Sequence, residues 1–148
     1  MNDLRGRRAV RIAAAVAAVL TVAAGLGVRA VTGGEFAKCA GDALYTVLVY
    51  ALVLVAAPRL RPLPAAGLAA ALSWAVELFQ LTGLPDELGR RSVLARLVLG
   101  STFNAPDLLW YVVGAALAAV VHAGAVRLVR QPGTGPRGSR KGPAPSRY

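Results

Sequence analysis

The sequence has little charge and only one cysteine. Of its 148 residues, 16% are charged and 56% are hydrophobic, whereas roughly 25% of the residues in soluble domains are charged. The charges are also segregated and leave four apolar runs, each close to the length of about 20 residues that a helix needs to cross a bilayer. A soluble domain this small could not bury four such runs. The single cysteine, Cys39, excludes an intrachain disulfide and a cysteine metal cluster.

The basic residues flank the apolar runs instead of forming one polar face. The net charge is +10, but this placement predicts membrane orientation and gives no sign of a nucleic-acid partner. With a cytoplasmic N-terminus, twelve of the 17 Lys and Arg residues lie on the cytoplasmic side. The other five are Arg29, Lys38, Arg90, Arg91 and Arg96. The sequence therefore predicts a multi-pass protein of the plasma (inner) membrane with both termini cytoplasmic.

These runs predict an all-α, integral membrane four-helix bundle. The expected segments are a basic cytoplasmic N-terminus over 1–8, spans at about 9–31, 41–57, 64–82 and 105–127, an outer loop over 83–104, and a disordered basic cytoplasmic tail over 128–148. Within the outer loop, the pattern from Leu88 to Leu99 predicts a short interfacial helix between the third and fourth spans. The first run also resembles a secretory signal, so its cleavage after Ala30 stays an alternative.

Polar residues recur at helical spacing within the apolar spans. Ser73, Glu77 and Gln80 share one face of the third span, and Asp107, Tyr111 and Gly114 share one face of the fourth. Asp42 begins the expected second span, after a polar loop over 32–40, where it either caps the helix or faces the same interior.

Three carboxylates on three spans are thus expected at similar depth near the outer face. Unpaired carboxylates in lipid are costly, so we expect cations to pair with them. Our hypothesis is an outward-facing site with Arg90 or Arg91 above the acids. Its predicted ligand-binding residues are Asp42, Glu77, Gln80, Arg90, Arg91, Asp107 and Tyr111. We assign no catalytic residue, metal or cofactor.

Several short motifs together resemble a known bacterial membrane family. They are Gly41-Asp42-Ala43-Leu44-Tyr45, Glu77-Leu78-Phe79-Gln80-Leu81, Arg91, Leu99-Gly100-Ser101-Thr102-Phe103 and Asp107-Leu108-Leu109-Trp110-Tyr111-Val112-Val113-Gly114. The combination resembles the family called domain of unknown function (DUF) 2809. It is also similar to the VanZ-like membrane proteins, which share Glu-x-x-Gln, a following Arg and Asp-x-x-x-Asn-x-x-Gly; here Tyr111 stands at the Asn position, which favours the first family. The resemblance implies a four-helix protein of the cell envelope and no established chemistry.

Three functions remain open at this point. The first is an accessory module that binds a membrane lipid or other amphiphile, such as an anionic envelope lipid whose phosphate meets Arg90 and Arg91. The second is a structural scaffold. The third is an intramembrane enzyme on a lipid-linked substrate, with Glu77 or Asp107 as general acid or base, or with the three carboxylates holding a divalent cation. A transporter is disfavoured because the polar residues gather at one end, and a homo-oligomer stays possible.

Overall fold

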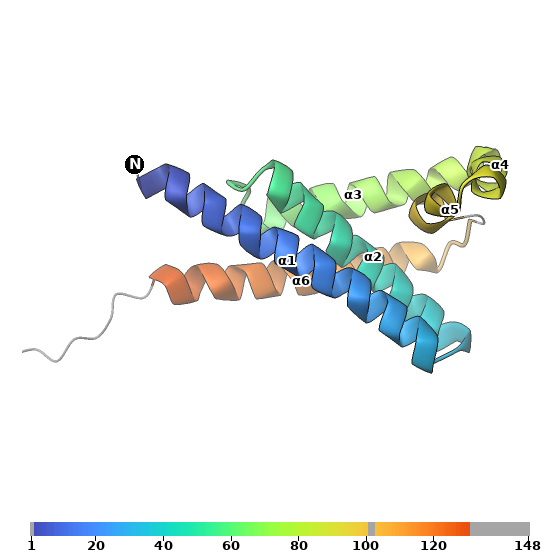
Figure 1. The fold of residues 1–148 in the computed structure, drawn as a ribbon, viewed down its shortest axis with the longest axis horizontal. Coiled ribbons are helices and arrows are strands. Elements are labelled where there is room, and N and C mark those ends of the chain that lie inside the picture. Colours follow the sequence, from blue (N-terminus) through green and yellow to red (C-terminus); the bar gives the residue numbers. More distant parts are fainter. Residues whose placement is uncertain (1, 101–102, 131–148) are drawn as a thin grey trace, which may run out of the picture.

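The computed structural model describes residues 2–100 and 103–130, and within these ranges it is helical with no strand. The helices are α1 (Asn2–Val31), α2 (Gly34–Ala56), α3 (Pro62–Gln80), α4 (Leu84–Arg91), α5 (Val93–Leu99) and α6 (Asp107–Arg130). Four of them, α1, α2, α3 and α6, are long and apolar enough to cross a membrane (Figure 1). The predicted all-α membrane helical bundle with four long spans is confirmed.

The four long helices pack as two pairs, α1 with α2 and α3 with α6. Helix α1 runs back along α2, and both α3 and α6 contact α2 and each other. The α1–α2 hairpin crosses the α3–α6 pair at an angle (Figure 1). Among the described helices, α1 contacts α2 alone, through small side chains such as Ala14 and Ala18, while its larger apolar side chains stay exposed. That exposed apolar surface suits a lipid environment.

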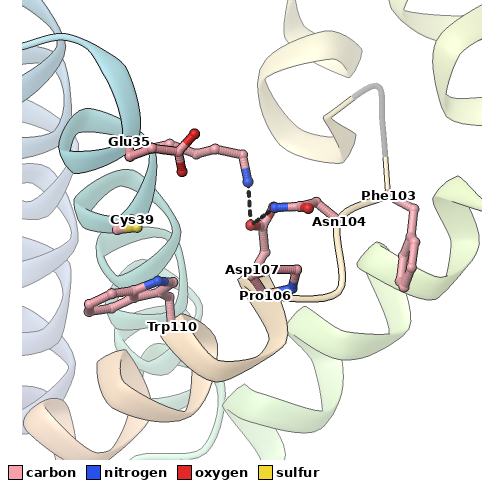
Figure 2. Close-up of a pocket in the computed structure, with 8 residues that line it drawn as sticks. Glu35, Cys39, Phe103, Asn104, Pro106, Asp107 and Trp110 are labelled. Atoms are coloured by element: carbon pink, nitrogen blue, oxygen red, sulfur yellow. Dashed lines mark hydrogen bonds and ion pairs between the residues drawn. The ribbon is translucent and has the colours of Figure 1, made fainter.

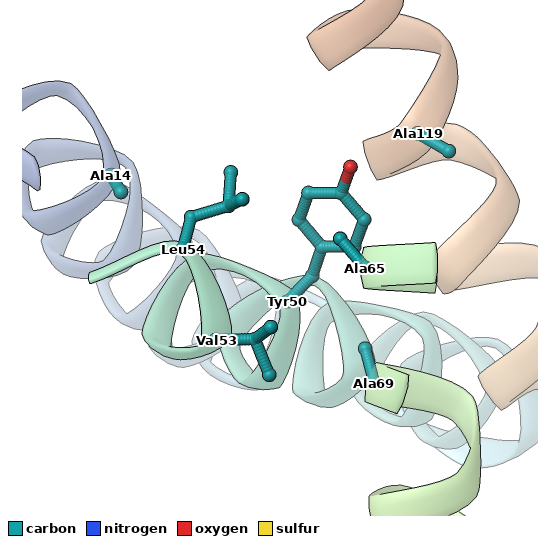
Figure 3. Close-up of a cluster of buried hydrophobic side chains, with 7 residues drawn as sticks. All are labelled: Ala14, Tyr50, Val53, Leu54, Ala65, Ala69 and Ala119. Carbon is teal, nitrogen blue, oxygen red and sulfur yellow. The ribbon is translucent and has the colours of Figure 1, made fainter. Parts of the chain in front are cut away.

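The apolar core lies in the half of the bundle that contains the turn between α2 and α3. Tyr50 and Val53 of α2 pack against Ala65 and Ala69 of α3 and Ala119 of α6 (Figure 3). Small residues allow helices in lipid to approach closely. Helix α6 approaches α2 closely at Gly114, where an added Cβ would collide with the Ala43 backbone.

Helix α2 begins earlier than its sequence suggested. The polar loop expected over 32–40 is wrong, because Thr32 and Gly33 alone separate α1 from α2. Gly34 adopts φ of 65°, which makes a sharp turn possible, and the residues after it continue as helix. Asp42 therefore lies about two turns inside α2, so of the two roles left open for it, the N-terminal cap is wrong.

The connection between α3 and α6 contains two short helices in place of the single one expected from Leu88 to Leu99. Ser92 is extended, with φ of −147° and ψ of 121°, and its hydroxyl accepts a hydrogen bond from Ala95 N at 3.3 Å. Because the Ser92 hydroxyl accepts this bond, Ser92 caps the N-terminus of α5, and its extended backbone separates α4 from α5. At the ends of the bundle, residues 2–8 belong to α1 and α6 continues to Arg130. The disordered tail predicted over 128–148 is therefore wrong for residues 128–130, and residues 131–148 lie outside the described residues.

Candidate functional site

Asp107 begins α6 at the end of the bundle opposite the turn between α2 and α3, and its carboxylate is buried. Its side chain lies under the ammonium group of Lys38, which extends from α2 and forms an ion pair with Oδ1. Asn104 Nδ2 donates to the same oxygen at 2.5 Å (Figure 2). Asp107 is 6% exposed, whereas the Lys38 side chain is 41% exposed. Lys38 therefore neutralises a buried acid and still reaches the surface.

Asp42 lies on the other side of Lys38. Its Oδ2 is 3.8 Å from the Lys38 nitrogen, and within the described chain that oxygen has no hydrogen-bond partner. Lys38 and Asp42 are four residues apart on α2, which places them on the same helix face. One ammonium group thus serves two carboxylates from two helices.

Glu77 is deeper in the bundle and is almost completely buried, with 1% exposure. The Tyr111 hydroxyl donates to its Oε2 at 2.7 Å, and the backbone N–H of Asn104 donates to its Oε1, also at 2.7 Å. No Lys or Arg in the described ranges forms an ion pair with it. Glu77 therefore joins α3 to α6 and to the segment before α6 through two uncharged donors.

A pocket of about 380 Å³ opens beside the Lys38–Asp107 pair. It is lined by Glu35, Lys38, Cys39, Phe103, Asn104, Pro106, Asp107 and Trp110, and Figure 2 shows that these residues come from the N-terminal part of α2, from the segment before α6 and from the start of α6. We call this the α2–α6 pocket. It combines an ammonium group and two carboxylates with two aromatic rings, a composition that suits the polar head of an amphiphile.

The structure separates the predicted site residues into two groups. Asp42, Glu77, Asp107 and Tyr111 meet in the bundle, as their spacing predicted. Arg90 and Arg91 do not cover these acids: they are exposed and pair within α4, with Asp86 at 2.7 Å and with Glu87 at 2.8 Å. Acids and arginines four residues apart on a helix satisfy each other in this way.

Gln80 is also set apart from the three acids. Its Nε2 donates to the Leu99 carbonyl at 2.7 Å and so fixes the end of α5. Gly100 follows with φ of 67°, and a Cβ there would lie 2.6 Å from Gln80 Nε2. Gln80 therefore holds in place the connection between α3 and α6.

Lys38, Asn104 and Glu35 were missed as site residues. Lys38 lay in a segment assigned to a loop, and its spacing of four from Asp42 was the available signal. Asn104 precedes the fourth span, so only the folded chain shows that its backbone and side chain bond two different acids.

Polar pairs also continue along the bundle toward the turn between α2 and α3. Thr46 donates to the Ser73 hydroxyl at 3.1 Å, and both residues are fully buried. Further along, the Tyr50 hydroxyl is 2.8 Å from His122 Nδ1. The expectation that polar residues gather at one end alone is therefore wrong: α2 carries polar contacts through most of its length.

The three carboxylates do not form a metal centre. Within the described ranges, no group of three His, Cys, Asp or Glu side chains is placed to hold an ion. This weakens the reading in which Asp42, Glu77 and Asp107 hold a divalent cation for an enzyme, because one of the three is occupied by uncharged donors and the others share Lys38.

Comparison with known proteins gives one match. The model of a family described as "Protein of unknown function (DUF2809)" matches residues 31–115, a range that holds Lys38, Asp42, Glu77, Asp107 and Tyr111. No curated protein and no solved structure matches the chain.

Proposed function

The chain belongs to the DUF2809 family, whose function is unknown, and we propose that it is a cell-envelope accessory protein that binds the head group of an amphiphilic ligand in the α2–α6 pocket. The observation that carries the proposal is the position of Lys38. Its ammonium group pairs with a buried acid and at the same time borders an open pocket. An ammonium group has three donors, so Lys38 can bind a ligand oxygen while it keeps Asp107.

The ligand group that best fits Lys38 is a phosphate. Phosphates of membrane lipids lie at the depth of the interface, where aromatic residues also gather. Trp110 and Phe103 line the pocket beside Lys38 and provide apolar surface for the part of the ligand nearest the acyl chains. In this proposal Lys38 takes the role that the sequence had suggested for Arg90 and Arg91.

We place the protein in the plasma membrane with both termini cytoplasmic and with the pocket facing outward. The charge distribution supports this orientation, because twelve of the 17 Lys and Arg residues are then inside. Asp3 at the start of α1 pairs with Arg59 in the turn between α2 and α3 at 2.6 Å. This contact joins two segments assigned to the cytoplasmic side.

The proposal is tested by native mass spectrometry of the full chain in detergent. The protein is delipidated and supplied with an equimolar mixture of phosphatidylethanolamine and phosphatidylglycerol. We expect one retained phospholipid per chain in the wild type and none in a Lys38→Met/Asp107→Asn variant, which removes both charges together so that no buried acid is left unpaired.

The matched control is an Arg90→Gln/Arg91→Gln variant, which removes two exposed cations outside the pocket. It should retain the lipid. Loss of the adduct in this control, with retention in the Lys38 variant, would move the site to α4 and contradict the proposal. Equal retention in all three proteins would mean that the adducts are nonspecific, which contradicts it as well.

A structural role is the second candidate, and Glu77 favours it. This carboxylate is buried, and each of its oxygens accepts a hydrogen bond, from Asn104 N–H or from the Tyr111 hydroxyl, so a ligand outside the bundle does not reach it. If these polar residues serve only to join helices, each substitution at Glu77 or at Lys38 will lower the stability by the same amount with phospholipid as without it.

A further inference from the structure

We infer that the α2–α6 pocket selects a zwitterionic phospholipid head group, one that carries a primary ammonium as well as a phosphate, over a head group that is only anionic. This inference rests on the proposed function and specifies its ligand. It depends on the charge balance of the residues that line the pocket.

The lining of the pocket has more acid than base. Glu35 and Asp107 contribute two carboxylates, and Lys38 contributes the single ammonium group among its lining residues. Asp42 lies behind Lys38 at 3.8 Å and adds further negative potential. A phosphate that approaches Lys38 therefore enters a site whose formal charge is already negative, and repulsion by the carboxylates opposes its binding.

A positively charged group on the same ligand offsets this repulsion between the phosphate and the carboxylates. Glu35 is exposed in the first turn of α2 and, within the described residues, forms no ion pair. Glu35 and Lys38 both line the pocket, and they are three residues apart on α2, which places them on the same side of that helix. With the phosphate at Lys38, a neighbouring ammonium group can reach Glu35, and a charge-assisted hydrogen bond forms between them.

The Glu35 carboxylate also determines which kind of ammonium group on the ligand binds best. A primary ammonium has three N–H donors, whereas a quaternary ammonium has none and is bound mainly by aromatic faces. Glu35 therefore favours a primary amine, of the kind found in ethanolamine head groups. Choline head groups retain the charge but cannot donate a hydrogen bond to Glu35.

The inference is tested by competition between lipids of identical acyl chains. Full-length protein in detergent is supplied with pairwise mixtures of phosphatidylethanolamine, phosphatidylcholine and phosphatidylglycerol, and the bound fraction of each is measured by native mass spectrometry. We expect phosphatidylethanolamine to exceed phosphatidylglycerol about tenfold, a difference of roughly 1.4 kcal/mol. We expect phosphatidylcholine to fall between them.

Two variants separate the ammonium contact from the phosphate contact. Glu35→Gln should keep phospholipid binding but reduce the preference for phosphatidylethanolamine over phosphatidylglycerol to about twofold or less. Glu87→Gln is the matched control, since Glu87 is an exposed acid on α4 outside the pocket, and it should keep the wild-type preference.

The outcomes also distinguish this inference from the function on which it rests. Binding that needs Lys38 but favours phosphatidylglycerol, or that shows no preference, overturns the inference and leaves the head-group site in place. A preference that is unchanged in Glu35→Gln overturns it too. Binding that survives Lys38→Met/Asp107→Asn overturns the proposed function itself.

Discussion

Lys38 and Asp107 lie 69 residues apart in the sequence and form an ion pair between α2 and α6. Asp107 is almost buried, and Asn104 is its second donor. The pair therefore holds the first turns of two membrane helices together at the mouth of the pocket. We expect disruption of this ion pair to change both the stability of the protein and its ligand binding, and each effect can be measured in its own assay.

We expect Lys38→Met to destabilise the protein by about 1–3 kcal/mol, because a buried carboxylate loses its charged donor. Adding Asp107→Asn should restore most of this loss, since the acid that needed a cation is then gone. Unfolding in mixed detergent micelles, followed by circular dichroism, measures both variants. Arg91→Met is the control: it breaks an exposed pair with Glu87 and should cost less than about 1 kcal/mol.

Substitutions at Glu77 should follow a definite order. In Glu77→Gln the amide oxygen can accept from Asn104 N, while the amide nitrogen donates to the Tyr111 hydroxyl, which can accept. We therefore expect a small loss for Glu77→Gln. Tyr111→Phe removes one donor, and Glu77→Ala leaves both donors unsatisfied and a cavity, so Glu77→Ala should cost most, about 2–5 kcal/mol.

The same unfolding assay, without added phospholipid, measures this order. A loss for Glu77→Gln as large as that for Glu77→Ala would mean that the negative charge itself is required. That result would contradict a purely hydrogen-bonded role for Glu77.

Gly114 should tolerate no side chain. An alanine Cβ there would lie 2.9 Å from the Ala43 carbonyl carbon and would overlap its oxygen, and both atoms belong to the backbone of α2. We expect Gly114→Ala to cost about 1–3 kcal/mol through overpacking. Gly67→Ala on α3 is the control: no atom lies within 4 Å of its added Cβ, so it should gain up to about 1 kcal/mol from helix propensity.

The sequence predicted the fold and the inner part of the site because both depend on local periodicity. Apolar runs set the four long helices, and spacings of four and three residues brought Glu77 and Tyr111 to facing sides of α3 and α6. The contacts made by residues in or next to the connections between helices could not be predicted from this periodicity. Lys38 was assigned to a loop because Gly33 and Gly34 precede it. Arg90 was expected over the buried acids, but Asp86, four residues before it on α4, is a nearer partner.

Gly100 is constrained both by its backbone conformation and by the nearby Gln80 side chain, and a comparison with Gly83 separates the two effects. It ends α5 with φ of 67°, and an added Cβ would also lie 2.6 Å from Gln80 Nε2, the donor to the Leu99 carbonyl. Gly83 has φ of 73° and no atom within 4 Å of an added Cβ. Gly83→Ala should therefore cost only the backbone strain of a non-glycine residue, about 1–2 kcal/mol, whereas Gly100→Ala should cost more because it also displaces Gln80.

A Gly100→Ala/Gln80→Ala double variant tests this account. If crowding against Gln80 adds to the strain, removing the Gln80 amide relieves that part, and the double variant loses less than the sum of the two single losses. Additive losses would mean that Gly100 is required for its backbone conformation alone. Native-state hydrogen exchange of the α5 amides, measured on all four proteins, reports whether this connection has loosened while the four long helices stay intact.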